Sequence, residues 1–385
     1  MLLDRATRAP LPLQMTWSLS SRRALPVAAN TMERELRYLA HLEVWLRQNN
    51  MSLSDPSSFI ERFTPSRIEN SLRPWLGKDT STRKVKKISV SSAEIKNRIL
   101  VIATFIDWVL GNAERSLSFR TEAAQCIAFS NARRDISRTF TEIVPTQSND
   151  SDIEGLSSPD ATKLLVAIHP DNPGNVWARG DGFHAKQIRH RNYLVVLILL
   201  AYGLRRGDLL KLCTGDVKTH GSNPTLWIRR RPDDPYDPRV WEPNAKTQER
   251  VLPLDSMLTR ALNDYVADCR KHIPNQKKTP YLILSLTNGK PMATRSLNDI
   301  FKPLKALFPG IHPHKLRHTH NDRLRAHCRE KGIGDKEMRD HAKYLNGWLG
   351  DNMGRYTKRE ARESARKISS QLQAQLFAPI LDVPF

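Results

Sequence analysis

The stretch of sequence that decides the fold is the run His314-Lys315-Leu316-Arg317-His318-Thr319. His314 and Arg317 are three residues apart, so a helix places both side chains on one face. Trp348 and Tyr356 follow downstream. An imidazole, a guanidinium, an indole and a phenol brought together can bind a phosphodiester and attack it. The alternative at this point is an amphipathic helix pair with ordinary surface charges, because short motifs carry a real false-positive risk.

A second stretch, further upstream, predicts a buried helix that ends close to an arginine. The residues from Tyr193 to Leu204 are nearly all apolar, and Gly203 marks a turn before Arg205. This run is too short to cross a bilayer, which takes about 20 apolar residues. Asp208 then opens another apolar segment, as the start of a second helix would. Arg205 is either a cap that reaches solvent or a functional group held rigidly near the core.

Together, the two stretches resemble the tyrosine recombinase, or phage integrase, family. Its first motif reads Gly-Leu-Arg, two further residues, Glu or Asp, and Leu, and it matches residues 203–209. Its second motif reads His-x-Leu-Arg-His-Thr and matches residues 314–319 at every fixed position. The third is usually Leu-Gly-His, where this chain has Asn346-Gly347-Trp348, a substitution with precedent in the family. The nucleophile follows as Tyr356, one residue closer than is common. The resemblance covers roughly residues 156–358.

The resemblance implies a catalytic site in which several charged groups surround one phosphate of DNA. Arg205 and Arg317 would bind the non-bridging oxygens with planar forks of donors. His314 would accept the proton of Tyr356, whose hydroxyl has an ordinary pKa near 10. Lys246 would protonate the departing 5′ oxygen. The resulting 3′-phosphotyrosine bond lets strands be rejoined, so the expected enzyme is independent of metal and ATP.

Other residues near these motifs are expected to play supporting roles. Trp348 would orient the phosphate and close the site, and Asp208 would pair with basic neighbours. His318 and Arg206 are expected to be structural. Lys246 lies between two predicted strands, residues 225–231 and 250–254, after a segment rich in proline and aspartate at 232–243. The sequence does not indicate what that segment contacts.

The composition points to a polyanionic partner. The formal net charge is +21 and the pI is about 10.1, well beyond what solubility requires. Charge alone fits a ribosomal or membrane-surface protein equally well. The four cysteines are scattered without metal-ligand spacing, so reduced thiols and neither metal nor cofactor are expected. Asp4 and Arg5 interrupt the start where a signal peptide would stay apolar, so secretion is not expected. Reduced thiols fit a cytoplasmic protein, and the resemblance implies association with the nucleoid.

The expected fold is mainly α with a small antiparallel β-sheet, divided into a helical domain and a mixed α/β catalytic domain. Residues 1–29 are expected to be a flexible or loosely docked arm and residues 30–143 a helical core-binding domain that clamps DNA. In that domain one helix should start at Asn30, and another should run from Ser91 or Ser92 to Gly111. Residues 144–155 would be a linker and 156–385 the catalytic domain, with an apolar C-terminal tail for assembly at 376–381. The tail packing on its own domain is the alternative.

The expected partner is double-stranded DNA with paired recognition sites. Phosphate contacts are expected from a basic loop, which could also be a solvated face: Lys78, Arg83, Lys84, Lys86 and Lys87. The resemblance implies a homo-tetramer in synapsis, a monomer or dimer off DNA, and room for an accessory DNA-bending or directionality factor, with no membrane. Two other functions stay open: a DNA-relaxing topoisomerase of the related tyrosine type, and a DNA-binding regulator without turnover.

Overall fold

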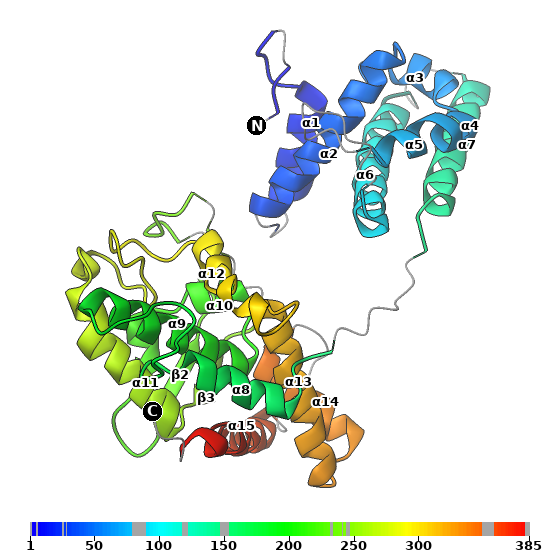
Figure 1. Ribbon diagram of the computed structural model, residues 1–385. Coiled ribbons are helices and arrows are strands. Elements are labelled where there is room, and N and C mark those ends of the chain that lie inside the picture. The colour runs from blue at the N-terminus through cyan, green and yellow to red at the C-terminus, as the bar shows by residue number, and fades with distance from the viewer. Residues whose placement is uncertain are drawn as a thin grey trace. The chain divides into compact units, whose positions relative to one another are not determined.

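The computed structural model describes residues 2–4, 7–24, 27, 29–78, 90–117, 122–146, 154–231, 234–240, 242–243, 247–348 and 358–381. Contacts between residues divide the chain into two units, Met1–Ser151 and Asp152–Phe385 (Figure 1). Each unit has an apolar core of its own. The fold is mainly helical with one small antiparallel sheet, as predicted.

The described part of the first unit consists of helices packed around aromatic and branched side chains. These helices are α1 (Pro12–Trp17) with a π-helical turn (Ser18–Arg23), α2 (Ala29–Gln48), α3 (Pro56–Arg62), α4 (Pro65–Arg67) with a π-helical turn (Ile68–Leu72), α5 (Arg73–Leu76), α6 (Ser92–Leu117) and α7 (Ala123–Glu142). The Ser91 hydroxyl accepts a hydrogen bond from the Glu94 N–H at 3.2 Å, which caps the start of α6 as predicted.

Gly111 does not end α6, contrary to the prediction, because it serves helix packing instead. The helix continues to Leu117. A Cβ atom at Gly111 would lie 2.8 Å from the Nη2 of Arg133 on α7. Arg133 crosses α6 there and pairs with Asp107 at 2.8 Å and with Glu114 at 2.5 Å. The glycine therefore makes room for an arginine that ties α6 and α7 together.

The N-terminal segment is not a free arm, which corrects our expectation for residues 1–29. Trp17 ends α1 and is only 1% exposed, with its ring packed edge-on against Phe105 of α6 at 5.6 Å between centroids. Arg22 pairs with Glu35 of α2. The prolines that suggested flexibility instead include Pro12 at the first position of α1, where proline suits a helix start.

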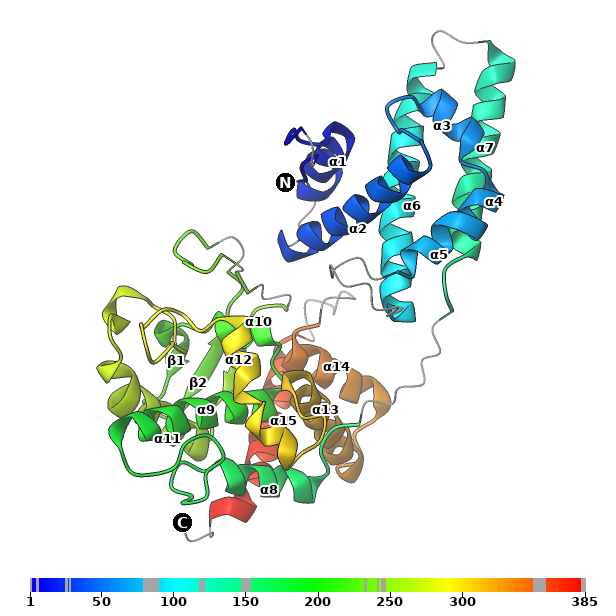
Figure 2. The same ribbon diagram turned by 45° about the horizontal axis from the view of Figure 1, so that its top comes forward.

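The second unit surrounds a buried helix with further helices and a three-stranded sheet (Figure 2). Its α-helices are α8 (Ser158–Ile168), α9 (Phe183–Tyr202), α10 (Arg206–Leu210), α11 (Ser256–Asp264), α12 (Thr294–Ile300), α13 (Pro313–Glu330), α14 (Asp335–Asn346) and α15 (Lys358–Leu381). Every residue from Tyr193 to Leu204 is buried. α9 is therefore the helix around which the others pack, with α13, α11, α8 and α15 against it.

The sheet consists of strands β1 (Val217–Lys218), β2 (Thr225–Ile228) and β3 (Arg250–Pro253), antiparallel in the order β1-β2-β3. Leu226 faces Leu252 across β2 and β3, and Ile228 faces Arg250. β2 ends earlier than predicted, because the arginines that follow leave the ladder to bind a buried carboxylate. Arg229 and Arg231 pair with Asp216 at 3.2 and 2.6 Å.

The C-terminal tail packs on its own unit, which corrects the expectation of an assembly tail. Leu376, Phe377 and Ile380 of α15 are buried in the core of the second unit. Gln373 is fully buried and binds the end of β3 and the loop that follows. Its amide donates to the Pro253 carbonyl at 3.2 Å and accepts from the Asp255 N–H at 3.0 Å. The apolar end thus contributes to the core of this unit.

The start of the second unit is fixed to α13. The Gly155 N–H donates to the Asp322 carboxylate at 2.9 Å, and the Leu156 N–H donates to the Thr319 hydroxyl at 2.7 Å. A Cβ atom at Gly155 would lie 2.4 Å from the Cα of Thr319. Thr319 therefore anchors the chain where it enters this unit. Among the described residues, no helix has the length and apolar character that crossing a membrane requires.

Replacing Trp17 tests whether the N-terminal segment belongs to the first unit's core. We expect Trp17→Ala to lower the free energy of unfolding of this unit by about 3–5 kcal/mol, since it removes a buried indole. Hydrogen exchange of the α6 amides in the full chain measures that loss locally. Leu19→Ala, at a residue 55% exposed in the same segment, is the control. Equal protection in the two variants would mean that the segment does not support α6.

Candidate active site

The turn at Gly203 connects the buried helix α9 to Arg205 at the start of α10. It is also hydrogen-bonded to α13, which carries Arg317. Gly203 follows Tyr202 with φ +58°, a conformation that favours glycine. Its carbonyl accepts a hydrogen bond from Nη1 of Arg317 on α13. A Cβ atom at Gly203 would lie 2.9 Å from Cδ2 of His320. Both the turn and the close approach therefore require glycine at this position.

Arg205 and Asp208 lie at the start of α10, directly after this turn. Arg205 precedes the first residue of the helix in extended backbone conformation, and its N–H donates to the Asp208 carboxylate at 3.4 Å. Asp208 is 1% exposed, whereas Arg205 is partly exposed. The backbone thus fixes the base of Arg205, while its side chain keeps access to solvent.

Arg317 is buried beside Arg205 and keeps unused hydrogen-bonding capacity. Its side chain is 4% exposed, and Nη2 has no hydrogen-bond partner among the described residues. Burial, followed by the nearby charges of Arg205 and Arg250, lowers the pKa of Arg317 to about 10. The guanidinium therefore remains charged at neutral pH, with donors available to an anion.

His314 lies one helical turn before Arg317 on α13 and is exposed. Partial burial, and then the neighbouring side chains of His318, Arg317 and Arg205, lower the pKa of His314 below its ordinary value. Its ring stands edge-on to that of His318, with 4.6 Å between centroids. The imidazole is consequently neutral at pH 7, the form that can accept a proton.

A buried hydrogen-bond network, which the sequence did not lead us to expect, surrounds Asp208. The Thr247 hydroxyl donates to the Asp208 carboxylate at 2.9 Å, and Nη2 of Arg250 lies 3.8 Å from that carboxylate. Arg250 is 3% exposed and donates to the Leu345 carbonyl at 2.9 Å. Burial lowers the pKa of Arg250 to about 10, while the Asp208 charge opposes that shift. Arg250 is thus a basic side chain within ion-pair distance of Asp208.

Trp348 is brought next to this network by the end of α14. Gly347 has φ +60°, and the Trp348 N–H donates to the Lys343 carbonyl at 3.0 Å. The Gly347 carbonyl accepts from the Gln248 N–H at 3.0 Å. A Cβ atom at Gly347 would lie 2.4 Å from Nη1 of Arg250. The half-buried Trp348 is therefore next in sequence to a residue that touches the segment following Lys246.

The structure brings together Arg205, Asp208, His314 and Arg317. It also places Gly347, the residue before Trp348, against Thr247 and Gln248, which lead into β3. Lys246 and Tyr356 lie outside the described residues. In the first unit, Lys78 is exposed with its ammonium 5.2 Å from the centre of the Trp75 ring. The other predicted phosphate contacts also lie outside the described residues: Arg83, Lys84, Lys86 and Lys87.

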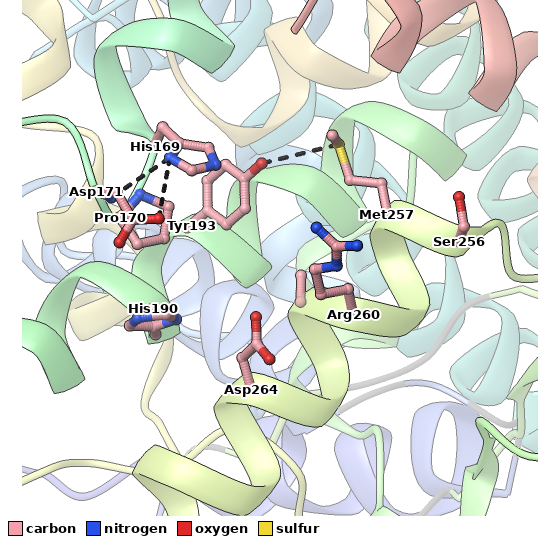
Figure 3. Close-up of a pocket in the computed structure, with 10 residues that line it drawn as sticks. His169, Pro170, Asp171, His190, Tyr193, Ser256, Met257, Arg260 and Asp264 are labelled. Carbon is pink, nitrogen blue, oxygen red and sulfur yellow. Dashed lines mark hydrogen bonds and ion pairs between the residues drawn. The ribbon is translucent and has the colours of Figure 1, made fainter. Parts of the chain in front are cut away.

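A separate small cavity lies between α9, α11 and the segment after α8 (Figure 3). Its volume is about 160 Å³, and His169, His190, Tyr193, Arg260 and Asp264 are among the side chains that line it. Burial lowers the pKa of both histidines. The lining includes none of the predicted catalytic residues. Over the part of the chain that the structure describes, no group of three or more His, Cys, Asp or Glu residues is arranged to hold a metal ion.

Replacing Gly203 tests whether the turn positions the arginines. We expect Gly203→Ala to cost about 1–3 kcal/mol of folding stability, because alanine is strained at this φ and its Cβ would contact His320. Thermal unfolding measures the loss. Gly215→Ala is the matched control, since a Cβ there meets nothing within 4 Å. A Gly203 variant as stable as the control would show that the turn tolerates a side chain.

His320 predicts a specific dependence of stability on pH. Burial, and then the Arg317 charge, lower its pKa to about 3, whereas the unfolded chain keeps a histidine pKa near 6.5. The unfolded state therefore binds more protons below pH 6.5, and stability falls as the pH drops. This group alone should cost about 2 kcal/mol between pH 7 and pH 5. In His320→Asn that part of the slope should vanish in denaturation curves. An unchanged slope would assign the effect to other groups.

Comparison with known proteins was made at the level of sequence and of structure. Residues 181–332 match the sequence model of the Phage integrase family. No characterised protein sequence matches the chain significantly. Two solved structures show how far the structure of this chain is similar to known ones. The Tn1549 transposon integrase in complex with circular intermediate DNA is 17% identical, with 92% of this chain and 98% of that chain covered and a TM-score of 0.48. The XerH site-specific recombinase bound to difH substrate is 13% identical, with 96% and 94% covered and a TM-score of 0.40.

The matched segment contains Arg205, Lys246, His314 and Arg317, and it ends before Trp348 and Tyr356. Within it, the structure places the first motif and the second motif side by side at the Gly203 turn. Residues 181–332 are therefore similar to the phage integrase family.

Proposed function

We propose that this protein is a site-specific DNA recombinase that cleaves and rejoins strands through a 3′-phosphotyrosine intermediate. The observation that carries the proposal is the buried Arg317, which has a free donor atom beside Arg205 and His314. The two guanidinium groups repel each other in the absence of an anion, and they disfavour a charged His314. A DNA phosphate would supply the opposite charge and accept hydrogen bonds from both guanidinium groups.

The proposed reaction assigns one step to each side chain. The Tyr356 oxygen attacks the phosphorus, and His314 accepts its proton. Arg205 and Arg317 stabilise the negative charge that develops on the non-bridging oxygens. The bond from phosphorus to the 5′ oxygen breaks, and Lys246 protonates that oxygen. A 5′ hydroxyl then attacks the phosphotyrosine in reverse and releases Tyr356. The phosphotyrosine keeps the energy of the broken bond, so rejoining requires no ATP.

The surroundings of these groups fit supporting roles. Asp208 balances part of the charge of three arginines from a buried position, and Trp348 would lie over the phosphate and limit the access of water. The net charge of +21 favours a nucleic acid as partner, and Lys78 with the basic residues after it would contribute phosphate contacts. We further propose paired DNA sites, a homo-tetramer in synapsis, and a biological role in integrating, excising or resolving a mobile element. Because Leu376, Phe377 and Ile380 are buried in their own unit, the tetramer would use surfaces other than these side chains.

Trapping the covalent intermediate tests the proposed function. Duplex DNA of random sequence, nicked so that cleavage releases a short oligonucleotide, would be selected for complexes that resist SDS. We expect wild type to give such an adduct. Tyr356→Phe should still bind DNA but form none, because it lacks the attacking oxygen. A wild type without any adduct would support the non-catalytic regulator instead.

The same selected duplex separates recombination from relaxation. Pairs of these sites on one plasmid should be joined or exchanged by wild type, whereas a supercoiled plasmid without the site should stay supercoiled. An adduct that survives Tyr356→Phe would place the nucleophile elsewhere. Relaxation of any plasmid, without joining of paired sites, would favour a topoisomerase.

A further inference from the structure

The segment rich in proline and aspartate between β2 and β3 is held by a buried lysine. Lys211 is 1% exposed, and three carboxylates from the segment converge on its ammonium group. Asp237 lies at 2.9 Å and Asp234 at 4.0 Å, and Glu242 is in direct contact. Because a lysine is almost never fully buried without partners, these contacts define where the segment docks.

Further contacts make this docking rigid. Arg239 binds the Asp237 carboxylate through two nitrogens, at 2.8 and 2.7 Å, and donates to the carbonyls of Leu210 and Met292 at 3.1 and 2.8 Å. The Tyr281 hydroxyl donates to Asp234. Burial alone would raise the pKa of Asp237, but hydrogen bonds from Arg239 and Lys211 lower it to about 2. The carboxylate is consequently charged at any working pH.

The docking site belongs to the same short helix that carries the catalytic motif. Lys211 directly follows Leu210, the last residue of α10, and Asp208 lies in the first turn of that helix. Asp208 holds Thr247 through its hydroxyl at 2.9 Å. The chain is therefore tied to α10 at Glu242, four residues before Lys246, and again at Thr247, the residue immediately after it.

We propose that Lys211 and Glu242 are positioning residues for the general acid Lys246. The inference rests on the proposed function, in which Lys246 protonates the leaving oxygen. Glu242 and Thr247 enclose only the four residues 243–246. Holding both to one helix would restrict where the intervening lysine can reach, and a misplacement of about 1 Å can cost roughly 100-fold in rate. The helix that orders Arg205 for phosphate binding would thereby also set the position of the proton donor.

The charged nature of the anchor supports positioning over simple stability. Burying an ion pair carries a large desolvation cost, and well-packed apolar side chains would stabilise the fold as well or better. What a lysine with three carboxylates adds is a defined geometry. The exposed side chains of the same segment, Tyr236 at 82% and Val240 at 89% exposure, contribute nothing to this anchor.

A substrate that needs no general acid tests the inference. Wild type, Glu242→Gln and Lys211→Met would cleave the nicked duplex selected above, made once with oxygen and once with sulfur at the 5′ bridging position. A thiol is far more acidic than an alcohol, with a pKa of about 8.5 in cysteine, so the thiolate leaves without a proton. We expect both variants to cleave the oxygen substrate about 10–100-fold more slowly in a single turnover. With sulfur, they should return to within about threefold of wild type.

Matched controls separate positioning from folding. Glu249→Gln makes the same chemical change in the same connection between β2 and β3. Among the described residues, Glu249 accepts a hydrogen bond from the Arg230 N–H at 3.0 Å and does not contact Lys211. The Glu249→Gln variant should therefore cleave the oxygen substrate at the wild-type rate. Glu242→Gln is milder than Lys211→Met because Lys211 keeps Asp237, and thermal unfolding of both checks the fold. Arg317→Lys should be slow on both substrates, since sulfur does not replace phosphate binding.

The outcomes are distinct. Slow cleavage by Glu242→Gln that sulfur restores supports the inference. A Glu242→Gln rate equal to wild type on oxygen, or equally slow cleavage of both substrates, overturns it while leaving the proposed recombinase intact. A wild type that forms no adduct with either substrate removes the proposed function and this inference with it.

Discussion

The second unit depends on one electrostatic interaction. It is the attraction between the buried Asp208 carboxylate and the positive charges of Arg205, Arg250 and Arg317 that lie near it. Three like charges around a buried point repel strongly in a medium of low dielectric. One carboxylate offsets part of that repulsion, and its hydrogen bonds from Thr247 and from the Arg205 N–H fix where it lies. The remaining positive charge makes the site ready for an anion. Asp208, in the first turn of α10, thus contributes both to the local fold and to the charge balance of the site.

Much of the fold could be predicted because its signals are local. The apolar run that forms α9, the glycine turn after it and the serine cap of α6 all follow from neighbouring residues. The two arginines could be paired because a known pattern spans both motifs. Predictions failed where a residue serves a distant partner. Gly111 suggests a helix end in isolation, yet its role depends on Arg133 of another helix.

The parts of the site that the sequence did not indicate are buried charges. In β3, Arg250 and Leu252 alternate with more exposed residues, so both lie on the buried side of the strand. An arginine in such a buried position is the signal that could have identified Arg250 as part of the site. Lys211 follows apolar residues at a helix end, where lysines are usually solvated. Its three carboxylates lie more than twenty positions downstream, so no local pattern links them. Trp17 and α15 were misjudged for a related reason, since burial depends on what the rest of the chain leaves uncovered.

The attachment of Gly155 and Leu156 to α13 has a mechanical consequence. Gly155 and Leu156, at the start of the second unit, are hydrogen-bonded to Asp322 and Thr319 of α13. The same helix carries His314 and Arg317. A helix of this length behaves as a stiff rod. A force that pulls on Gly155 and Leu156 would therefore act on α13 itself, since no loop lies between these hydrogen bonds and the helix. It would thus reach the side chains that would hold the phosphate.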